Sequence, residues 1–307
     1  MPRNQVSDWC ALPGGAAANI ACGLAKLGES VSFVGAVGKD GWGDALVTLL
    51  SDMGVEHTGV QRRLKVPTRE VYITCDRAGE RTSSSFSDRD PALFADAHLF
   101  ADSLDRALFS KAELLVLGLC GMAYSDTKQA VEQAIQFVQE IQTPIFVDID
   151  WQPMFWPQPS EATGCAYDLI GKAQFLKVSK VEAQWLFSTV SAVAIAHQFP
   201  HLQGVFITDE RQGCEYCLMG NEGYVSGFDV DIEETTGARD AFTAGFIHRL
   251  LRLSAKDKDA LADEAIARQA VTYACAVAAL TTTRMGAIAA LPTVTEIDAF
   301  LYLNAAR

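Results

Sequence analysis

The sequence lacks long apolar runs and is poor in basic residues. No stretch of about 18 or more apolar residues occurs, and Met1 to Pro13 contains no apolar run of the kind found in a secretory signal. Lys and Arg total 25 against 38 Asp and Glu, which gives a formal net charge of −13. Binding to a phosphate backbone requires clustered Lys and Arg, and no basic stripe is present. We therefore expect no nucleic-acid partner, no membrane partner and a cytoplasmic location.

The cysteines are scattered rather than concentrated in one segment. Cys214 and Cys217 form a C-x-x-C, but a lone pair falls short of the four ligands of a structural zinc site, and this pair interrupts a strand-like run. We expect reduced thiols without a metal or redox role. The eight cysteines are Cys10, Cys22, Cys75, Cys120, Cys165, Cys214, Cys217 and Cys275.

The pattern of apolar residues indicates an α/β fold. The chain has 307 residues, of which 49% are hydrophobic and 21% charged, and contains no repeat or low-complexity linker, so we expect a single domain over residues 1–307. Short apolar runs separated by helix-length segments predict a doubly wound, mainly parallel sheet flanked by helices. The predicted strands are 31–37, 113–119, 144–149, 175–178 and 205–208, and the predicted helices are 15–28, 44–53, 241–253 and 265–280.

Two further segments predict smaller β elements. Thr68 to Asp76 alternates, reaches a turn signal at Ala78-Gly79 and continues into a polar run, which indicates a small β-sheet lid with strands around 66–90. Residues 214–230 are typical of a hairpin, with its turn predicted at Asn221-Glu222-Gly223.

The strongest local signal for chemistry is the run TTGARDAFTAG at residues 235–245, which follows a strand and opens a helix. A turn of small residues there presents free N–H groups and the positive end of the helix dipole to an anion. Asp240 falls in the first helical turn, at the edge of this anion site. The alternative is that Asp240 simply caps a core helix.

Three motifs resemble the signatures of the PfkB (ribokinase-like) carbohydrate kinases. ETTGARDAF at 234–242 is similar to the D-T-T-G-A-G-D-A-F signature. PGGAAANIACGLAKLG at 13–28, together with VGAVGKDGWG at 34–43, is similar to the first signature, G-G-A-P-A-N-V-A followed by G-x-D-x-x-G. Further similarity in DIDWQPMFW at 148–156 and FLKVSKVEAQWLF at 175–187 points to the fructokinase branch. The resemblance implies a ribokinase-like fold and transfer of the γ-phosphoryl group of ATP to a sugar hydroxyl with Mg²⁺.

The resemblance also implies roles for particular residues. Asp240 matches the catalytic base, and its backbone N–H would complete an anion hole. Glycines beside a ligand allow close backbone approach, although for Gly14 and Gly15 close helix packing is the alternative. The other matches are Gly237, Ala238 and Arg239 in the anion hole, Gly14, Gly15 and Asn19 for the sugar, Thr208, Gly213 and Ser179 for the nucleotide, and Glu182 for hydrated magnesium.

Several positions depart from the family pattern at the phosphate end of the site. Asp150, Gln152 and Glu210 replace Asn, Arg and Gly, Ser179 replaces Asn, and Arg239 replaces Gly, so this region is more negative by two charges. A carboxylate about 5 Å from a phosphate costs on the order of 3 kcal/mol at an effective dielectric constant near 20. Arg239 either obstructs close backbone approach or compensates for the charge missing at Gln152.

Two hypotheses about function therefore remain open. The first is a fructokinase-like sugar kinase whose partners are a sugar and ATP, with a homodimer formed through the lid. The second is a catalytically impaired pseudokinase that acts as a binding or scaffold protein. Few residues precede the first motif, so we expect either a truncated sequence or a sheet without the family's first strand, which ends in a sugar-binding Asp.

Overall fold

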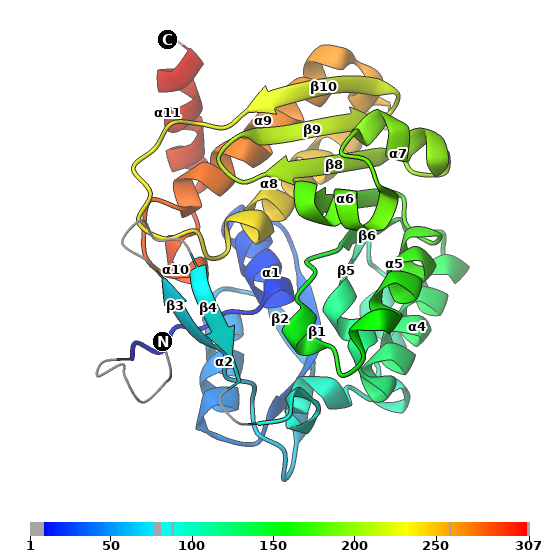
Figure 1. Ribbon diagram of the computed structural model, residues 1–307, viewed down its shortest axis with the longest axis vertical. Coiled ribbons are helices and arrows are strands. Elements are labelled where there is room, and N and C mark those ends of the chain that lie inside the picture. The colour runs from blue at the N-terminus through cyan, green and yellow to red at the C-terminus, as the bar shows by residue number, and fades with distance from the viewer. Residues whose placement is uncertain (1–8, 76–80, 87–88, 258, 306–307) are drawn as a thin grey trace.

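The computed structural model describes residues 9–75, 81–86, 89–257 and 259–305, and its central element is a six-stranded sheet in the order β10-β9-β8-β7-β6-β5 (Figure 1). Four strands run parallel: β5 (Leu115–Gly118), β6 (Ile145–Asp148), β7 (Phe175–Ser179) and β8 (Gly204–Asp209). The last two, β9 (Gly213–Leu218) and β10 (Asn221–Ser226), form an antiparallel hairpin at one edge. The mainly parallel sheet predicted from the sequence is confirmed.

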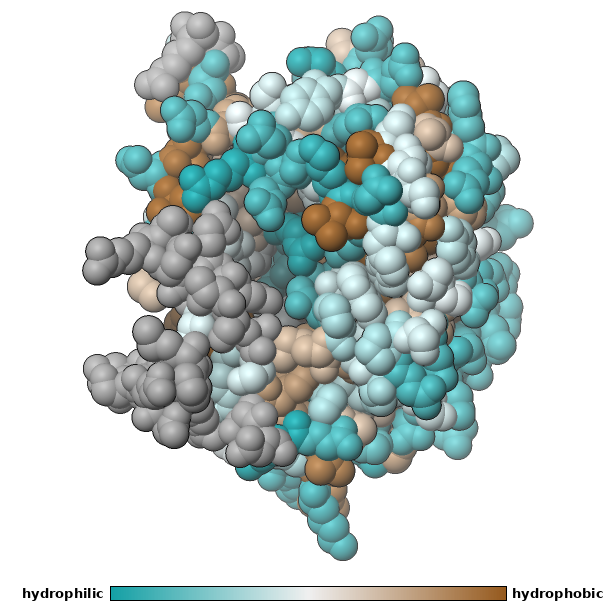
Figure 2. All heavy atoms as spheres, viewed as in Figure 1, coloured by the Kyte–Doolittle hydropathy of each residue, from teal (hydrophilic) through white to brown (hydrophobic). Residues whose placement is uncertain are grey.

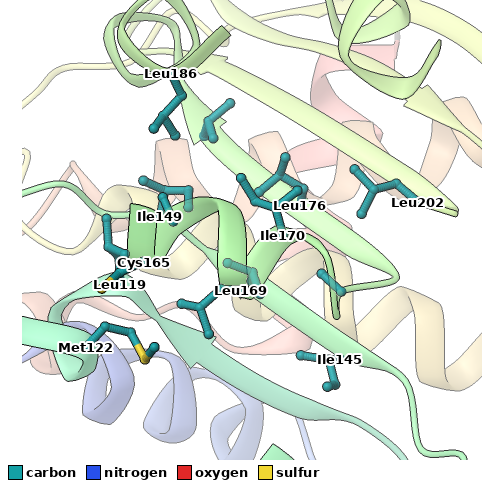
Figure 3. Close-up of a cluster of buried hydrophobic side chains, with 14 of the residues drawn as sticks. Leu119, Met122, Ile145, Ile149, Cys165, Leu169, Ile170, Leu176, Leu186 and Leu202 are labelled. Atoms are coloured by element: carbon teal, nitrogen blue, oxygen red, sulfur yellow. The ribbon is translucent and has the colours of Figure 1, made fainter. Parts of the chain in front are cut away.

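The central strands are mostly apolar, and both faces of the sheet are covered. In β6, Ile145 and Val147 belong to one buried cluster and Phe146 to another, as the alternation of side chains along a strand requires. Figure 3 shows the first cluster, in which Ile145 and Leu176 from the sheet lie with Leu169 and Ile170 of α5.

Helices lie on both faces of the sheet (Figure 1). The first face carries α4 (Ser125–Glu140), α5 (Ala162–Ile170), α6 (Lys180–Phe187) and α7 (Ala192–Gln198), and the second carries α1 (Ala16–Lys26), α8 (Ala238–Ser254) and α9 (Glu264–Thr281). The C-terminal helix α11 (Val294–Ala305) contacts α9. The shorter helices are α3 (Arg106–Phe109) and α10 (Ala287–Ala290).

The first β–α–β unit forms a sheet of its own. β1 (Ser32–Gly38) pairs in parallel with β2 (Glu56–Arg63), and α2 (Gly41–Asp52) connects them. Within the described residues neither the second edge of β1 nor that of β5 pairs with a strand, and α1 contacts both strands. Residues of β1 and β5 line the same cavity, so two open strand edges border one space. The apolar pattern of the sequence did not indicate this division.

Two predicted β segments need correction. The β9–β10 turn lies at Met219-Gly220, with φ values of 49° and 84°, whereas Asn221 to Gly223 already belong to β10. A tight hairpin turn requires positive φ at both central residues, and that requirement, rather than the polar N-E-G signal, sets its place. In the lid, β3 (Tyr72–Cys75) pairs with β4 (Arg81–Ser85) and begins later than predicted. Asp76 and the predicted Ala78-Gly79 turn lie outside the described residues.

The late start of the lid strand follows from contacts made by Thr68 and Arg69. The Thr68 N–H and hydroxyl both donate to the Asp40 carboxylate, at 2.8 and 2.7 Å, and Asp40 also caps α2 through the Gly43 N–H. Arg69 pairs with Asp96 at 2.6 Å. These polar contacts fix the chain before β3, so the lid leaves the G-x-D-x-x-G turn at a defined point.

None of the described helices has the length and apolar character needed to cross a membrane. Seven cysteines are free thiols: Cys10, Cys22, Cys120, Cys165, Cys214, Cys217 and Cys275. The C-x-x-C pair lies on β9, where residues three apart point to opposite faces of the sheet, so Cys214 and Cys217 do not form a shared ligand site.

Candidate active site

The first turn of α8 is the centre of the site. Gly237, with φ 83°, precedes this helix, and a Cβ at that position would lie 2.6 Å from the Ala287 Cβ, so only glycine fits. No side chain caps the helix at Gly237. In the first turn the Ala238 N–H donates to the Thr235 carbonyl at 3.3 Å, and the N–H groups of Arg239 and Asp240 precede the first i to i−4 hydrogen bond, from Ala241 to Gly237. A helix start of this kind offers N–H donors and a positive dipole end to an anion.

Asp240 is a buried carboxylate with an acidity suited to proton transfer near neutral pH. The residue is 8% exposed, and the Asn19 amide Nδ2 donates to its Oδ2 at 2.7 Å. Burial, followed by the nearby charges of Asp150 and Asp148, raises the pKa of Asp240 to about 7. Lys177 and the Asn19 hydrogen bond oppose this shift without cancelling it. A general base works best when its pKa lies near the working pH.

A buried ion pair lies beneath α8. Lys177 on β7 donates to the Asp148 carboxylate at the end of β6, at 2.6 Å, and the Thr243 hydroxyl of α8 donates to the same oxygen at 2.8 Å. The side chains of Lys177 and Asp148 are 2% and 5% exposed. These contacts join β6 and β7 to α8, the helix that carries Asp240.

Arg239 bridges two carboxylates that come from different elements. Its Nη2 lies 2.6 Å from Asp150 Oδ1, after β6, and its Nη1 lies 3.3 Å from Glu182 Oε1, in the first turn of α6. Asp150 adopts a left-handed backbone conformation, with φ 37°. The two carboxylates raise the pKa of Arg239 in spite of its burial, so the guanidinium keeps its charge.

Glu182 is occupied by protein hydrogen bonds rather than free to coordinate an ion. Its Oε2 accepts from the Ser179 N–H at 2.6 Å, and its Oε1 accepts from the Trp151 N–H at 2.7 Å and from Arg239. Ser179 and Glu182 thus form a capping box that begins α6. In the part of the chain that the structure describes, no group of three or more His, Cys, Asp or Glu side chains is placed to hold a metal ion. The side chains present therefore do not fit a directly coordinated ion.

The residues predicted for the nucleotide lie at the carboxyl edge of the sheet. Thr208 is near the end of β8, and its hydroxyl donates to the Val178 carbonyl at 3.4 Å. Gly213 begins β9 with φ 122°, and a Cβ there would lie 2.0 Å from the Val225 carbonyl oxygen, so this turn requires glycine. Parallel strands bring their carboxyl ends, and the loops that follow them, to the edge where ligands of α/β folds bind.

The structure brings the sequence-predicted residues together around one cavity. Its volume, about 3280 Å³, exceeds the 300–1,000 Å³ range common for ligand pockets because it continues between β1 and β5. Figure 2 shows this face of the molecule hollowed near its centre, with hydrophilic residues deep in the hollow. The predicted residues that line it are Gly14, Gly15, Asn19, Ser179, Glu182, Thr208, Gly213, Gly237, Ala238, Arg239 and Asp240.

Two groups of contacts were missed by the sequence analysis. Lys177 lies within the apolar run FLKVS, where a lysine requires a buried partner, so its position was a usable signal. Asn19 was predicted to face the sugar, and the structure shows that it also holds Asp240. Nothing in the local sequence pairs residues 221 positions apart.

Residues 2–294 match the sequence model of a protein family described as pfkB family carbohydrate kinase. This chain belongs to the pfkB family of carbohydrate kinases. As a pfkB kinase it transfers a phosphoryl group to a sugar hydroxyl. Among curated relatives, the Arabidopsis thaliana "Probable fructokinase-3" is 32% identical over 94% of this chain and 82% of the relative. Zea mays "Fructokinase-1" is 32% identical over 93% of this chain and 87% of the relative.

Solved structures of fructokinases share the fold. A Xylella fastidiosa fructokinase with bound ATP superposes with a TM-score of 0.87 at 26% identity, over 96% of this chain and 92% of that one. A Vibrio cholerae fructokinase with fructose, ADP and calcium bound has a TM-score of 0.85 at 28% identity, over 96% and 93%. The ribokinase-like fold expected from the sequence is therefore confirmed.

Proposed function

We propose that this pfkB kinase transfers the γ-phosphoryl group of ATP to a hydroxyl of fructose, with Asp240 as the general base. The observation that carries the proposal is the position of Asp240, a buried carboxylate with a pKa of about 7, in the first turn of α8. A proton acceptor and a set of N–H donors thus lie on one turn of helix. Phosphoryl transfer requires these two functions side by side.

Each part of the turn has a distinct task in the proposed reaction. Ionised Asp240 accepts the proton of the sugar hydroxyl as its oxygen attacks the γ-phosphorus. Asn19 fixes the carboxylate by donating to Oδ2. The backbone N–H groups of Gly237, Ala238, Arg239 and Asp240 stabilise the negative charge on the transferred group, and that of Ala238 exchanges the Thr235 carbonyl for the phosphate. Donors of this type contribute about 10²–10³ in rate each.

The nucleotide lies along the carboxyl edge of the sheet in this proposal, beside Thr208, Gly213 and Ser179. A divalent cation, which we expect to be Mg²⁺, would supply charge neutralisation at the phosphates of the nucleotide. Since Glu182 already accepts three hydrogen bonds, we assign it the support of α6 and a place near the phosphates rather than direct coordination.

Fructose is the proposed acceptor because the curated relatives are named fructokinases and because the Vibrio cholerae structure contains fructose. Gly14 and Gly15 lie where α1 begins, and Gly15 has φ 119°, so this turn brings backbone rather than side chains to the cavity. We propose that the sugar binds between this turn and Asp240. The homodimer through the lid and the cytoplasmic location stay predictions.

A coupled ADP-release assay tests the proposal, with Mg-ATP and a panel of fructose, ribose, glucose, tagatose and adenosine. We expect turnover that depends on fructose. The altered phosphate end, where Arg239 is already paired with two carboxylates, is the observation that favours a pseudokinase. No turnover with any acceptor, combined with no thermal stabilisation by ATP, would establish that alternative.

A further inference from the structure

The Arg239 side chain is placed so that it can exchange its carboxylate partners for a phosphate. Its backbone N–H belongs to the first turn of α8, where we place the γ-phosphate, while its guanidinium points away to Asp150 and Glu182. Arg239 therefore contributes both a backbone N–H to the anion site and the only guanidinium on that turn. A phosphate bound to the first turn lies within reach of the Arg239 side chain.

The two carboxylate partners of Arg239 differ in how much they depend on its guanidinium. Glu182 is 4% exposed and accepts the N–H groups of Trp151 and Ser179, so its charge is stabilised without Arg239, whose Nη1 is 3.3 Å away. Asp150 makes the shorter contact, at 2.6 Å, and its other described donor is Gln152 Nε2 at 3.4 Å. Release of Arg239 from Asp150 is therefore the step that determines whether the guanidinium can move.

The Arg239–Asp150 pair is partly buried and open to solvent on the arginine side. The Arg239 side chain is 40% exposed and that of Asp150 is 20% exposed, so a polyphosphate can approach the guanidinium without first entering the protein core. A triphosphate carries more charge than one carboxylate and presents several oxygens to the planar fork of a guanidinium. Competition between Asp150 and a nucleotide for Arg239 favours the nucleotide.

We propose that Arg239 leaves Asp150 when ATP binds and that its guanidinium then contacts the terminal phosphates, with Asp150 as the competing partner that lowers nucleotide affinity. The inference rests on the proposed function for the place of the phosphates. It assigns the Arg239 side chain, beyond its backbone N–H, to nucleotide binding. The positive charge at this point of the site then belongs to the protein rather than to a protein-bound metal ion.

The alternative is that Arg239 stays in place and only neutralises Asp150. A double-mutant cycle separates the two roles. Arg239→Gln, Asp150→Asn and the double variant are compared with the wild type in calorimetric titrations with ATP, once with MgCl₂ and once with EDTA. Arg106→Gln is the matched control, since Arg106 forms an exposed ion pair with Glu140 outside the cavity. Melting temperatures verify that each variant is folded.

We expect Arg239→Gln to weaken ATP binding at least tenfold in both the wild-type and the Asp150→Asn background, and Asp150→Asn alone to tighten it. Arg106→Gln should leave the affinity unchanged. If Arg239→Gln has no effect once Asp150 is replaced, so that the double variant binds ATP like Asp150→Asn alone, Arg239 is a neutralising residue and the inference is wrong.

Turnover with fructose, measured on the same proteins, distinguishes this inference from the proposed function. ATP binding that depends on Arg239 in both backgrounds, without turnover, supports the inference and contradicts the kinase assignment. Turnover together with the null result of the cycle contradicts the inference alone. A wild type that binds no ATP contradicts both.

Discussion

The ionisation of Asp240 determines how turnover should respond to pH. With a pKa of about 7, about 9% of this carboxyl is ionised at pH 6 and about 91% at pH 8. If the ionised form is the base, kcat/KM for fructose should rise about tenfold between these values and level off above pH 8. The assay is initial-rate ADP release at saturating Mg-ATP, with the coupling enzymes in excess at every pH.

Asp150→Asn provides the internal control for this pH profile. The charge of Asp150 is the second cause, after burial, of the raised pKa of Asp240. Removal of a like charge beside a buried carboxyl lowers the pKa of that carboxyl by an amount on the order of one unit. Removing Asp150 also leaves Arg239 less neutralised, which acts in the same direction. We expect the midpoint to move to lower pH by about one unit or more.

Titration of ATP or of the coupling system would give a midpoint that no substitution in the protein moves. A profile that is flat between pH 6 and pH 8, or a midpoint that Asp150→Asn leaves in place, would refute the assignment of the acidic limb to Asp240.

Two further predictions concern the scaffold. Lys177→Met leaves the Asp148 carboxylate buried without its ion pair, so it should lower the free energy of unfolding by about 3 to 5 kcal/mol in urea titrations. The control is Lys180→Met, which removes an exposed ion pair with Asp209 and should have no measurable effect. Equal losses of stability in the two variants would contradict the argument that the buried pair matters. The amides on the open edges of β1 and β5 should exchange with deuterium faster than those of β6 to β8, and equal protection would show that these edges are paired in solution.

The sequence was informative wherever local patterns decide the structure. Strands buried on both faces are recognisable as continuous apolar runs, and β6 and β8 were placed within two residues of their observed ends. The place of Asp240 in the first turn of a helix followed from the small-residue turn, although the helix was predicted over 241–253 and α8 begins at Ala238. In these segments local preference and tertiary packing agree.

Contacts between distant segments could not be predicted in this way. The Arg239–Asp150 pair joins residues 89 positions apart and depends on the left-handed backbone at Asp150, which no local signal indicates. The β9–β10 turn was misplaced because backbone dihedral angles at Met219-Gly220 outweighed a polar sequence cue. The separation of β1 and β2 from the main sheet depends on which elements lie beside them in the folded protein. The periodicity of apolar residues along the sequence contains no information about those neighbours.

The central claim is that Asp240 removes the proton of a fructose hydroxyl during phosphoryl transfer. The most direct test is detection of phosphorylated fructose by ³¹P NMR after incubation of fructose and Mg-ATP with the wild type or with Asp240→Asn. Burial raises the pKa of Asp240 in the folded protein above its value in the unfolded chain, so the contribution of protonated Asp240 to the free energy of unfolding is lost as the pH rises through about 7. At pH 8 the wild type has lost this contribution, and Asp240→Asn should therefore melt no lower than the wild type. We predict phosphorylated fructose with the wild type and at least a thousandfold less with a fully folded Asp240→Asn. Equal product from both proteins would contradict the account.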